Sequence, residues 1–400
     1  MFSIEFSFLE YCLAGGALCL SVVLLSLLLP RLLRVRRQVM ADGAVMASVA
    51  ETADDATPYP PVSVIVTADD DAWNLSTLLP DLLAQDYPAP MEVIVVDNGE
   101  GGPSQTVVAQ LQPEHPNLYL TFAPSRSRNL SRKKLAVTLG VKAAGYEHLI
   151  LTNGNCRIAS PLWLRAMCRH FADGKDVVVG YSYPAPADAD DPRESRGAAF
   201  SRVRGALQWL GSAIKGNVWR ADGNNLGYTR SLFYANRGFQ SSLNLKYGDD
   251  DIFIREIATP ENSAVELSPE SFVEELEQDL PRAHRLDRIH RDFTARRLPS
   301  GPRRWWGLIS IVWWCYLLVT AAVIVVGLPS LVPLIAASVL ALITGLTVDI
   351  FWRRTMGALA SRKLCLTVGW FLTVHPFSTL AYRIRGRRAR YTNFTWTTEK

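Results

Sequence analysis

The sequence predicts an α/β domain with a mostly parallel sheet, flanked by membrane-spanning helices. Apolar segments occur near both ends of the 400-residue chain, and a long polar stretch separates them. In that stretch, short runs rich in Val and Ile alternate with helical patterns, which is typical of a parallel sheet covered by helices. Two of the runs, VIVVD ending at Asp97 and LILTNGN ending at Asn155, finish in polar side chains, as they do where open α/β sheets bind ligands. A ligand site anchored to a bilayer indicates chemistry on a lipid or a membrane-bound acceptor.

An N-terminal transmembrane helix is expected in residues 1–30. Tyr11–Leu29 carries no charge and, at about 1.5 Å per residue, just crosses the ~30 Å hydrocarbon core. Glu10 precedes this run and a cluster of arginines follows it, whereas a cleaved signal peptide, the alternative, carries its positive charge first. Arginine after the span places the polar domain in the cytoplasm.

A second membrane segment is expected as a hairpin in residues 305–348. Its two helices are Trp305–Gly327 and Leu331–Val348, joined by a tight turn, and they return the chain to the cytoplasmic side. Residues 349–400 contain one more apolar run, Leu364–Tyr382, which is followed by a basic tail. A full crossing would carry that tail outside, so we expect a re-entrant or interfacial segment, with a fourth crossing as the alternative.

Residues 31–60 are predicted to be a basic and linker segment, and residues 61–300 the α/β domain. Asp42–Pro61 is rich in Ala, Asp, Thr and Pro, which favours a linker. Periodicity then predicts strands and helices in alternation. The predicted strands are Val62–Val66, Met91–Val96, Leu118–Phe122 and Leu149–Leu151, and the predicted helices are Asn74–Gln85 and Leu130–Ala144.

Composition limits the classes of partner that we expect the protein to bind. The net charge is only +4, but arginines cluster beside the apolar segments, which indicates contact with membrane lipids. No cluster is interleaved with aromatic side chains, so no nucleic-acid partner is expected. The six cysteines are scattered without CxxC or zinc-type spacing, which fits a reduced, cytoplasm-facing domain.

Six short motifs occur in order along the α/β domain. They are Val62–Val66, Val95–Gly99, Ser131–Ala136, Leu149–Cys156, Gly223–Leu226 and Gly248–Asp251. Together with the membrane segments they resemble a membrane-anchored, inverting nucleotide-sugar glycosyltransferase of the family-2 type, which implies a GT-A fold. The resemblance covers roughly residues 60–300.

The resemblance implies a nucleotide-sugar site at the strand ends. Asp97 and Asn98 would hold the nucleoside, although a helix cap is the alternative for Asp97. On the same resemblance, one of the aspartates at 69–71 is expected to reach the nucleotide. Arg132 and Lys133, at the start of a helix, would attract the diphosphate, and Arg132 is preferred because a guanidinium binds phosphate in a bidentate manner. Arg296 is a further candidate, with an interfacial helix rich in arginine as the leading alternative for that region.

Asn153 and Asn155 depart from the family pattern. The family has Asp-x-Asp here, which binds Mg²⁺ or Mn²⁺ on the diphosphate, whereas an amide brings no charge to a metal. Three alternatives follow: the diphosphate itself holds the metal, cations such as Arg132 and Arg296 replace it, or catalysis is lost. An Asx-rich turn is the purely structural interpretation.

The acidic triplet Asp249, Asp250 and Asp251 matches the family's catalytic acidic pair. Register favours Asp250 as the general base that deprotonates the acceptor hydroxyl. Helix-start carboxylates are the structural alternative. The sequence therefore predicts a non-processive transfer of sugar from a nucleotide-sugar donor to a lipid-linked or glycan acceptor. A catalytically inactive scaffold or regulatory protein is the alternative function, favoured by the two asparagines.

Overall fold

The computed structural model of the protein describes residues 8–393, apart from residues 53–57, 69–71, 98–101, 124–130, 187–193, 244, 246, 328–330, 362–363 and 365. The chain divides into two compact units. The helical unit comprises Met1–Arg37, Arg196–Gly211 and Ser300–Tyr382. The sheet unit comprises Gln38–Ser195, Ser212–Pro299 and Arg383–Lys400.

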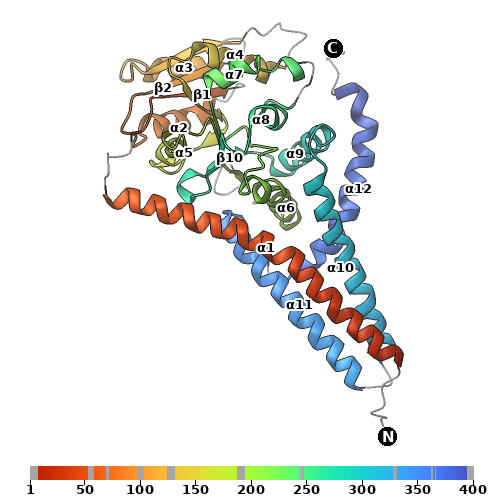
Figure 1. Ribbon diagram of the computed structural model, residues 1–400. Coiled ribbons are helices and arrows are strands. Elements are labelled where there is room, and N and C mark those ends of the chain that lie inside the picture. The colour runs from red at the N-terminus through yellow and green to blue at the C-terminus, as the bar shows by residue number, and fades with distance from the viewer. Residues whose placement is uncertain are drawn as a thin grey trace. The chain divides into compact units, whose positions relative to one another are not determined.

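A seven-stranded, mostly parallel sheet forms the centre of the sheet unit, in the order β3-β2-β1-β4-β8-β6-β9. Figure 1 labels two of its strands, β1 and β2. Its strands are β1 Val62–Ala68, β2 Met91–Asp97, β3 Leu118–Phe122, β4 His148–Asn153, β6 Val177–Val179, β8 Leu226–Thr229 and β9 Ser263–Val265. Strands β1 to β4 pair in parallel, and β8 runs antiparallel to its neighbours. All of β1 is buried, as expected of a strand covered on both faces. The predicted α/β class and the strands β1 to β4 are confirmed.

The order of the strands reverses at β1. The chain builds outward from β1 through β2 to β3, and then places β4 on the other side of β1. The register pairs Ala68 with Asp97 and Thr67 with Asn153, so the carboxyl ends of β2, β1 and β4 lie at one edge. Ligands of open α/β sheets bind in the crevice outside such a reversal. The topology therefore brings the candidate residues of β2 and β4 to one place.

Helices cover both faces of this sheet. They are α2 Ala72–Leu83, α3 Pro103–Leu111, α4 Arg132–Ala143 and α5 Trp163–Ala172. Alternate residues of β1, such as Val64, share one buried cluster with Leu78 of α2, Val108 of α3 and Trp163 of α5. Helix α4 packs on the opposite face so closely that a Cβ at Gly140 would lie 2.4 Å from Ile65 Cγ2. Glycine at this position lets α4 approach the sheet, and it sets the height of the α4 N-terminus above the strand ends.

The rest of the sheet unit adds a second sheet of three strands, in the order β5-β10-β7, and several short helices. These elements are β5 Cys156–Arg157, β7 Ser182–Pro186, β10 Val273–Glu277, α7 Arg230–Ala235, η1 Gln240–Ser242, α8 Asp251–Ile257, η2 Pro269–Ser271 and α9 Leu280–Thr294. Tyr228 of β8 packs against Phe233 of α7 and Phe253 of α8, with ring centroids 6.0 and 5.3 Å away. This aromatic cluster fixes α8 and, with it, the acidic triplet at its start.

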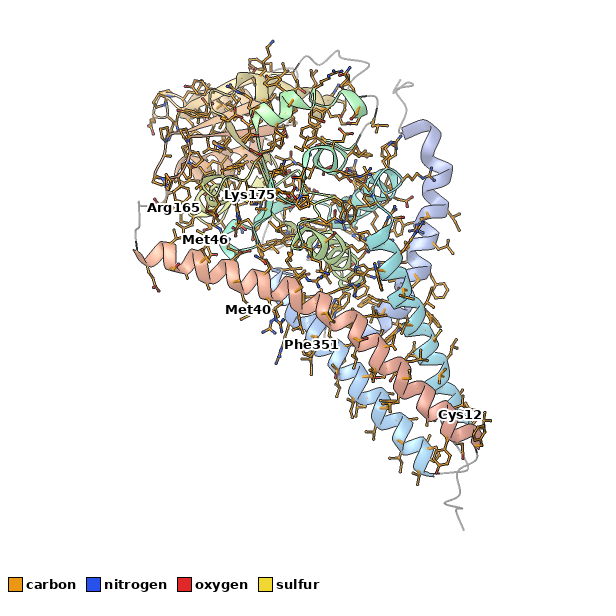
Figure 2. The ribbon with its side chains drawn as sticks, in the orientation of Figure 1. Cys12, Met40, Met46, Arg165, Lys175 and Phe351 are labelled. Atoms are coloured by element: carbon orange, nitrogen blue, oxygen red, sulfur yellow. The ribbon has the colours of Figure 1, made fainter. Side chains whose placement is uncertain are left out.

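The helical unit contains the apolar helices. Its elements are the first part of α1 Phe8–Thr52, most of α6 Arg196–Ala213, then α10 Gly301–Val326, α11 Leu331–Ala358 and much of α12 Val368–Asn393. Among the described residues, three helices are long and apolar enough to cross a membrane, over Phe8–Glu51, Gly301–Val326 and Val332–Ala358. Large apolar side chains along them, including Val22, Ile311 and Leu342, are exposed, and so is Cys12 near the start of α1 (Figure 2). These helices correspond to the predicted N-terminal helix and hairpin, whose turn lies outside the described residues.

Polar and aromatic contacts join the helices of this unit. Ser21 of α1 shares a hydrogen bond of 2.8 Å with Thr344 of α11. The buried guanidinium of Arg204, on α6, donates to Ser310 of α10 at 2.9 Å and bonds the His375 ring of α12 at 2.7 Å. Helix α12 continues through Pro376, so the last apolar run from Val368 onward forms one helix with the basic residues after it. That this segment is re-entrant or interfacial stays a prediction.

The expected linker at Asp42–Pro61 is wrong for its first part, because α1 continues to Thr52. Aspartate suggested a loop, but Asp42 is buried and accepts a hydrogen bond from Arg169 Nη2 of α5 at 2.8 Å and one from the backbone N–H of Leu267 at 3.1 Å. Arg169 Nε also donates to the fully buried Glu266 at 2.6 Å, and Glu266 lies 2.9 Å from His170 Nε2. A buried ion-pair network thus holds the end of α1 against the sheet unit, where sequence composition indicated a linker.

We predict that Glu266→Gln destabilises the protein in a pH-dependent way. Burial raises the pKa of Glu266, but His170 and Arg169 outweigh it, so its pKa lies below the ordinary value. Its stabilising effect is therefore present above the unfolded pKa of about 4.3 and is lost as the pH falls through the lower folded value. Thermal unfolding in detergent at pH 7 should show a loss of about 3 kcal/mol. The loss should shrink at pH 3, and the exposed control Glu114→Gln should show none; an equal loss at both pH values would contradict the ion-pair explanation.

Candidate functional site

A hydrogen-bonded chain joins the ends of β1 and β4 to the loop before β8. Thr67 Oγ1 donates to Asn153 Oδ1 at 2.6 Å, and Asn153 Nδ2 donates to Asn224 Oδ1. Asn224 in turn donates through its backbone N–H to Asp222 at 3.2 Å and through Nδ2 to Ser182 Oγ at 3.2 Å. Asn153 therefore anchors the 222–225 loop at the strand reversal.

The same loop contacts α4 and the acidic triplet. A Cβ at Gly223 would lie 3.3 Å from Lys133 Nζ and 3.4 Å from Asp250 Cβ. Lys133 Nζ also forms an ion pair of 3.3 Å with Asp249. The start of α4, the 222–225 loop and the acidic triplet thus meet at one point, which the sequence predicted only through separate motifs.

The three aspartates of the triplet have different partners. Asp249 pairs with Lys133, and Asp251, which is fully buried, pairs with Arg220 at 3.1 Å. Asp250 is 9% exposed, caps α8 through the backbone N–H of Asp251 at 2.6 Å, and lies 3.8 Å from His290 Nε2. Among the described residues Asp250 forms no ion pair with a lysine or arginine. Its carboxylate is the one whose charge is left for another partner.

The segment in front of the triplet is held by the buried ammonium of Lys134. Lys134 Nζ donates to the backbone carbonyls of Ser242 at 2.5 Å, Leu245 at 3.0 Å and Tyr247 at 3.1 Å. Burial lowers the pKa of this lysine, although the nearby aspartates oppose that effect. Gly248 follows with φ of +101°, a backbone conformation that favours glycine. Lys134 and Gly248 together turn the chain so that the triplet faces α4.

The structure places the other candidate residues as follows. Asp97 is 1% exposed at the end of β2, where it pairs with Ala68 of β1. Arg132 is exposed at the first residue of α4, and Arg296 is exposed after α9; neither side chain forms a hydrogen bond or ion pair with the other described residues. Asn98 and residues 69–71 lie outside the described part of the chain. The structure thus brings together Lys133, Asn153 and the triplet, and it does not bring Arg296 into contact with them.

Four residues of the site were not identified from the sequence: Arg220, Asp222, Glu275 and His290. Burial and then the negative charges of Asp222, Glu277 and Asp287 raise the pKa of Glu275 to about 8, while Lys133 opposes this. His290 belongs to α9 and stacks on Tyr247, with ring centroids 4.6 Å apart. One sequence feature could have identified His290, namely the two histidines within the arginine-rich helix α9. Their distance along the chain from the triplet gave no reason to connect them with it.

The residues at Asn153 and Asn155 do not fit a metal ion on a sugar diphosphate. The Asn153 amide is engaged on both sides, by Thr67 and by Asn224. The Asn155 side-chain oxygen faces Cys156 Sγ at 3.9 Å, and its backbone carbonyl accepts from Leu276 N at 2.8 Å. Neutral amides add no charge to hold a hard cation. The proposed chemistry therefore contains no step through a metal at this pair.

The fold resembles that of solved glycosyltransferases. The mannosyltransferase PcManGT from Pyrobaculum calidifontis, solved in complex with GDP-Man and Mn²⁺, aligns over 92% of this chain and 99% of its own with a TM-score of 0.53 and 19% identity. The S. aureus protein TarS, residues 1–349, aligns over 82% of this chain and 90% of its own with a TM-score of 0.40 and 15% identity. The first of these comparisons shows that the chain shares the fold of this mannosyltransferase.

Sequence comparison adds no relative: no family model and no curated protein matches this chain.

We predict that Lys134→Met destabilises the segment before the triplet. Methionine keeps most of the volume but leaves buried carbonyls without a donor, at a cost of about 2–3 kcal/mol. Hydrogen exchange of residues 239–257 should become faster in the mutant. Lys142→Met, on the exposed side of the same helix, is the matched control and should leave exchange unchanged. Wild-type exchange in Lys134→Met would show that the ammonium does not hold this segment.

A second prediction concerns Glu275. Its folded pKa of about 8 lies above the unfolded value, so the folded chain holds a proton that the unfolded chain releases, and stability falls as the pH rises through that interval. Glu275→Gln removes this charge. The mutant should melt at a higher temperature than the wild type at pH 9 and at about the same temperature at pH 4. A mutant that is less stable at pH 9 would show that the carboxylate is satisfied in its charged form.

Proposed function

We propose that this protein is a membrane-bound, inverting glycosyltransferase with a GT-A fold of the family-2 type. It transfers a sugar from a nucleotide-sugar donor to a lipid-linked or glycan acceptor. The observation that carries the proposal is the meeting of α4, the 222–225 loop and the acidic triplet beside the strand reversal, with Asp250 the triplet member not paired to a lysine or arginine. The glycosyltransferase fold supports it.

Asp250 has the position and the environment of a general base. Lys133 and Arg220 neutralise the aspartates on either side of it, so the negative charge of Asp250 is not committed to a cation. In the proposed reaction, the acceptor oxygen attacks the anomeric carbon as the bond from that carbon to the diphosphate oxygen breaks. The acceptor proton passes to Asp250, and the bonding electrons leave with the nucleoside diphosphate. Attack opposite the leaving group inverts the anomeric centre.

The nucleotide-sugar donor is proposed to bind at the strand ends and the N-terminus of α4. Asp97, buried at the end of β2, is proposed to accept hydrogen bonds from the nucleoside. Arg132 is exposed at the first residue of α4 and has no described partner, so its guanidinium is available to the diphosphate beside the helix N–H groups. The neighbour PcManGT binds GDP-Man, which supports a nucleoside diphosphate sugar as the donor class.

The negative charge of the leaving diphosphate is proposed to be stabilised by cationic side chains of this chain. The amide pair Asn153 and Asn155 supplies none, and Asn153 instead holds the 222–225 loop. Lys133 lies next to that loop, and Arg132 directly precedes Lys133 in the chain. Both are therefore proposed to stabilise the departing negative charge.

The acceptor is proposed to be bound to the membrane. Three apolar helices of sufficient length support an integral membrane protein. Arginines after the first span and around the hairpin support a cytoplasmic position for the sheet unit. Few membrane spans follow the sheet unit in the sequence, and so few helices can hardly form a channel that conducts a polysaccharide. This favours the addition of single sugars.

A non-catalytic scaffold or regulatory role is the second candidate function. The engagement of Asn153 in structural hydrogen bonds favours it, because the position of the family's metal-binding carboxylates has become part of the framework. Detectable sugar transfer by the purified wild-type protein would exclude this role.

The test of the enzyme proposal is Asp250→Asn. Purified protein is incubated with radiolabelled nucleotide sugars and a lipid extract, and transfer to lipid or glycan is measured. Loss of the base should slow transfer by about 10²–10⁴. Donor binding, measured by equilibrium dialysis, should stay close to that of the wild type, because Asp250 does not contact the donor in the proposal.

Asp173→Asn, an exposed aspartate in the turn after α5, is the control and should transfer at the wild-type rate. Undiminished transfer by Asp250→Asn would move the base to another residue. No transfer by the wild type with any donor would favour the scaffold role.

A further inference from the structure

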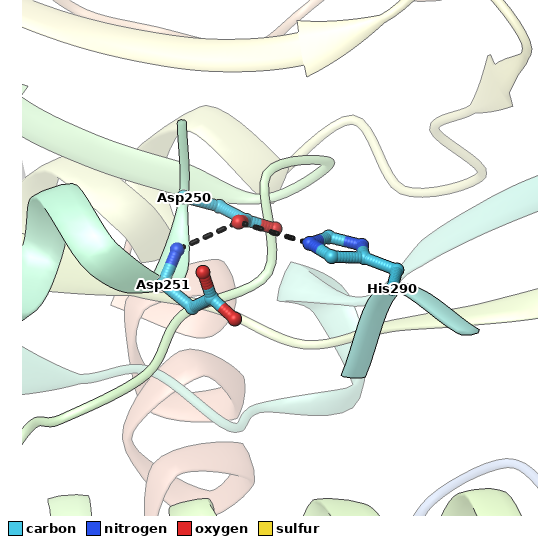
Figure 3. Close-up of side chains that lie close together, drawn as sticks. All are labelled: Asp250, Asp251 and His290. Atoms are coloured by element: carbon cyan, nitrogen blue, oxygen red, sulfur yellow. Dashed lines mark hydrogen bonds and ion pairs between the residues drawn. The ribbon is translucent and has the colours of Figure 1, made fainter. Parts of the chain in front are cut away.

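Three side chains from two separate elements converge beside the proposed reaction centre. Asp250 and Asp251 come from the start of α8, and His290 comes from α9 (Figure 3). One ligand atom from each lies within 4.8 Å of the other two. Figure 3 shows the two carboxylates and the imidazole directed toward one small space. Acidic side chains alone do not define a metal site, so the polar atoms in that space decide what it can bind.

Two of those atoms are buried without a hydrogen-bond partner. Asp251 is fully buried, and its Oδ1 accepts no hydrogen bond from any described residue. Nε2 of His290 is likewise buried without a hydrogen bond, and its contact with Asp250 Oδ1 is long, at 3.8 Å. A buried carboxylate oxygen without a donor is costly unless a cation or another donor faces it. The unsatisfied oxygen and ring nitrogen are therefore suited to bind a cation.

The surrounding contacts hold these groups in place, as the outer contacts of metal ligands do. Arg220 donates to the other oxygen of Asp251 at 3.1 Å, which leaves Oδ1 free to bind. Tyr247 stacks on the His290 ring with an interplanar angle of 22°. Asp250 is fixed by its hydrogen bond to the backbone N–H of Asp251. Ligand atoms of a tetrahedral zinc ion lie about 2.0–2.2 Å from it and about 3.4 Å from one another, so binding draws these atoms together by up to about 1.4 Å.

We propose that Asp250, Asp251 and His290 form a site for a divalent transition-metal ion, with Zn²⁺ preferred. Two carboxylate oxygens and one imidazole nitrogen, with a fourth position open, match a three-ligand zinc site. An imidazole ligand favours Zn²⁺ over Mn²⁺, and Mg²⁺ prefers oxygen ligands alone. The site thus differs in ion preference from a hard cation carried by a sugar diphosphate.

An ion at this site inhibits transfer. Its bond to Asp250 occupies the carboxylate that accepts the acceptor proton, so ion and proton compete for the same oxygens. This consequence rests on the proposed function, whereas the binding of the ion does not.

The test measures Zn²⁺ binding directly to the full-length protein in detergent, without nucleotide and without a histidine tag. Isothermal titration should show one Zn²⁺ bound per chain through this cluster, weaker binding of Mn²⁺, and no comparable binding of Mg²⁺. His290→Ala should weaken Zn²⁺ binding by at least about tenfold, because it removes a ligand. His284→Gln, which changes the other histidine of α9, is the matched control and should bind as the wild type does.

A second variant guards against misfolding. Asp251→Asn keeps the shape of the side chain and should also weaken Zn²⁺ binding, and a melting curve checks that each variant is folded. A nucleotide-free wild type that binds no Zn²⁺, or a folded His290→Ala that binds with wild-type affinity, overturns the metal site. Zn²⁺ binding without any sugar transfer would instead contradict the proposed function and leave the site standing.

Where transfer is measurable, Zn²⁺ should inhibit the wild type at concentrations that leave His290→Ala unaffected. Equal inhibition of both proteins would show that the ion acts elsewhere and would overturn the competition with the proton.

Discussion

The buried ammonium of Lys134 is the interaction on which the candidate site depends. It gathers the carbonyls of Ser242, Leu245 and Tyr247 around one positive charge and so ties α4 to a part of the chain more than a hundred residues later. The neighbouring Lys133 then reaches Asp249, and Gly248 turns the chain between the two contacts. A buried charge is costly to desolvate, and the several carbonyl acceptors offset that cost only in this one arrangement. The position of the acidic triplet follows from it.

Cationic and amide side chains have separate roles in the candidate site. Lys133 and Arg220 neutralise the outer aspartates of the triplet, which gives the middle one a separate chemistry. Asn153, which stands where the family that the sequence resembles has a metal-binding carboxylate, links β1 to the 222–225 loop. An amide can both donate and accept, so it serves as a framework link where a carboxylate could only accept. The positive charge beside the strand ends therefore comes from α4.

Helix α1 belongs to both compact units of the chain. Its first part lies in the helical unit, and from Gln38 onward it belongs to the sheet unit, where Asp42 joins the network of Arg169 and Glu266. An apolar helix that continues without a break into a buried ion-pair network differs from an apolar helix followed by a linker.

Local patterns in the sequence determined the α/β class, the strands β1 to β4, the helix α4 and the apolar helices, because each depends on hydrophobic periodicity within a short window. They also identified Asp97, Lys133, Asn153 and the triplet, although the roles of these residues came from a resemblance and from proposals. Only the tertiary structure decided that Asp42 lies in a helix, that Lys134 is buried, and that Arg220, Glu275 and His290 surround the triplet. Those facts depend on contacts between residues far apart in the chain, and no local pattern in a single sequence encodes which distant partners will satisfy a buried charge.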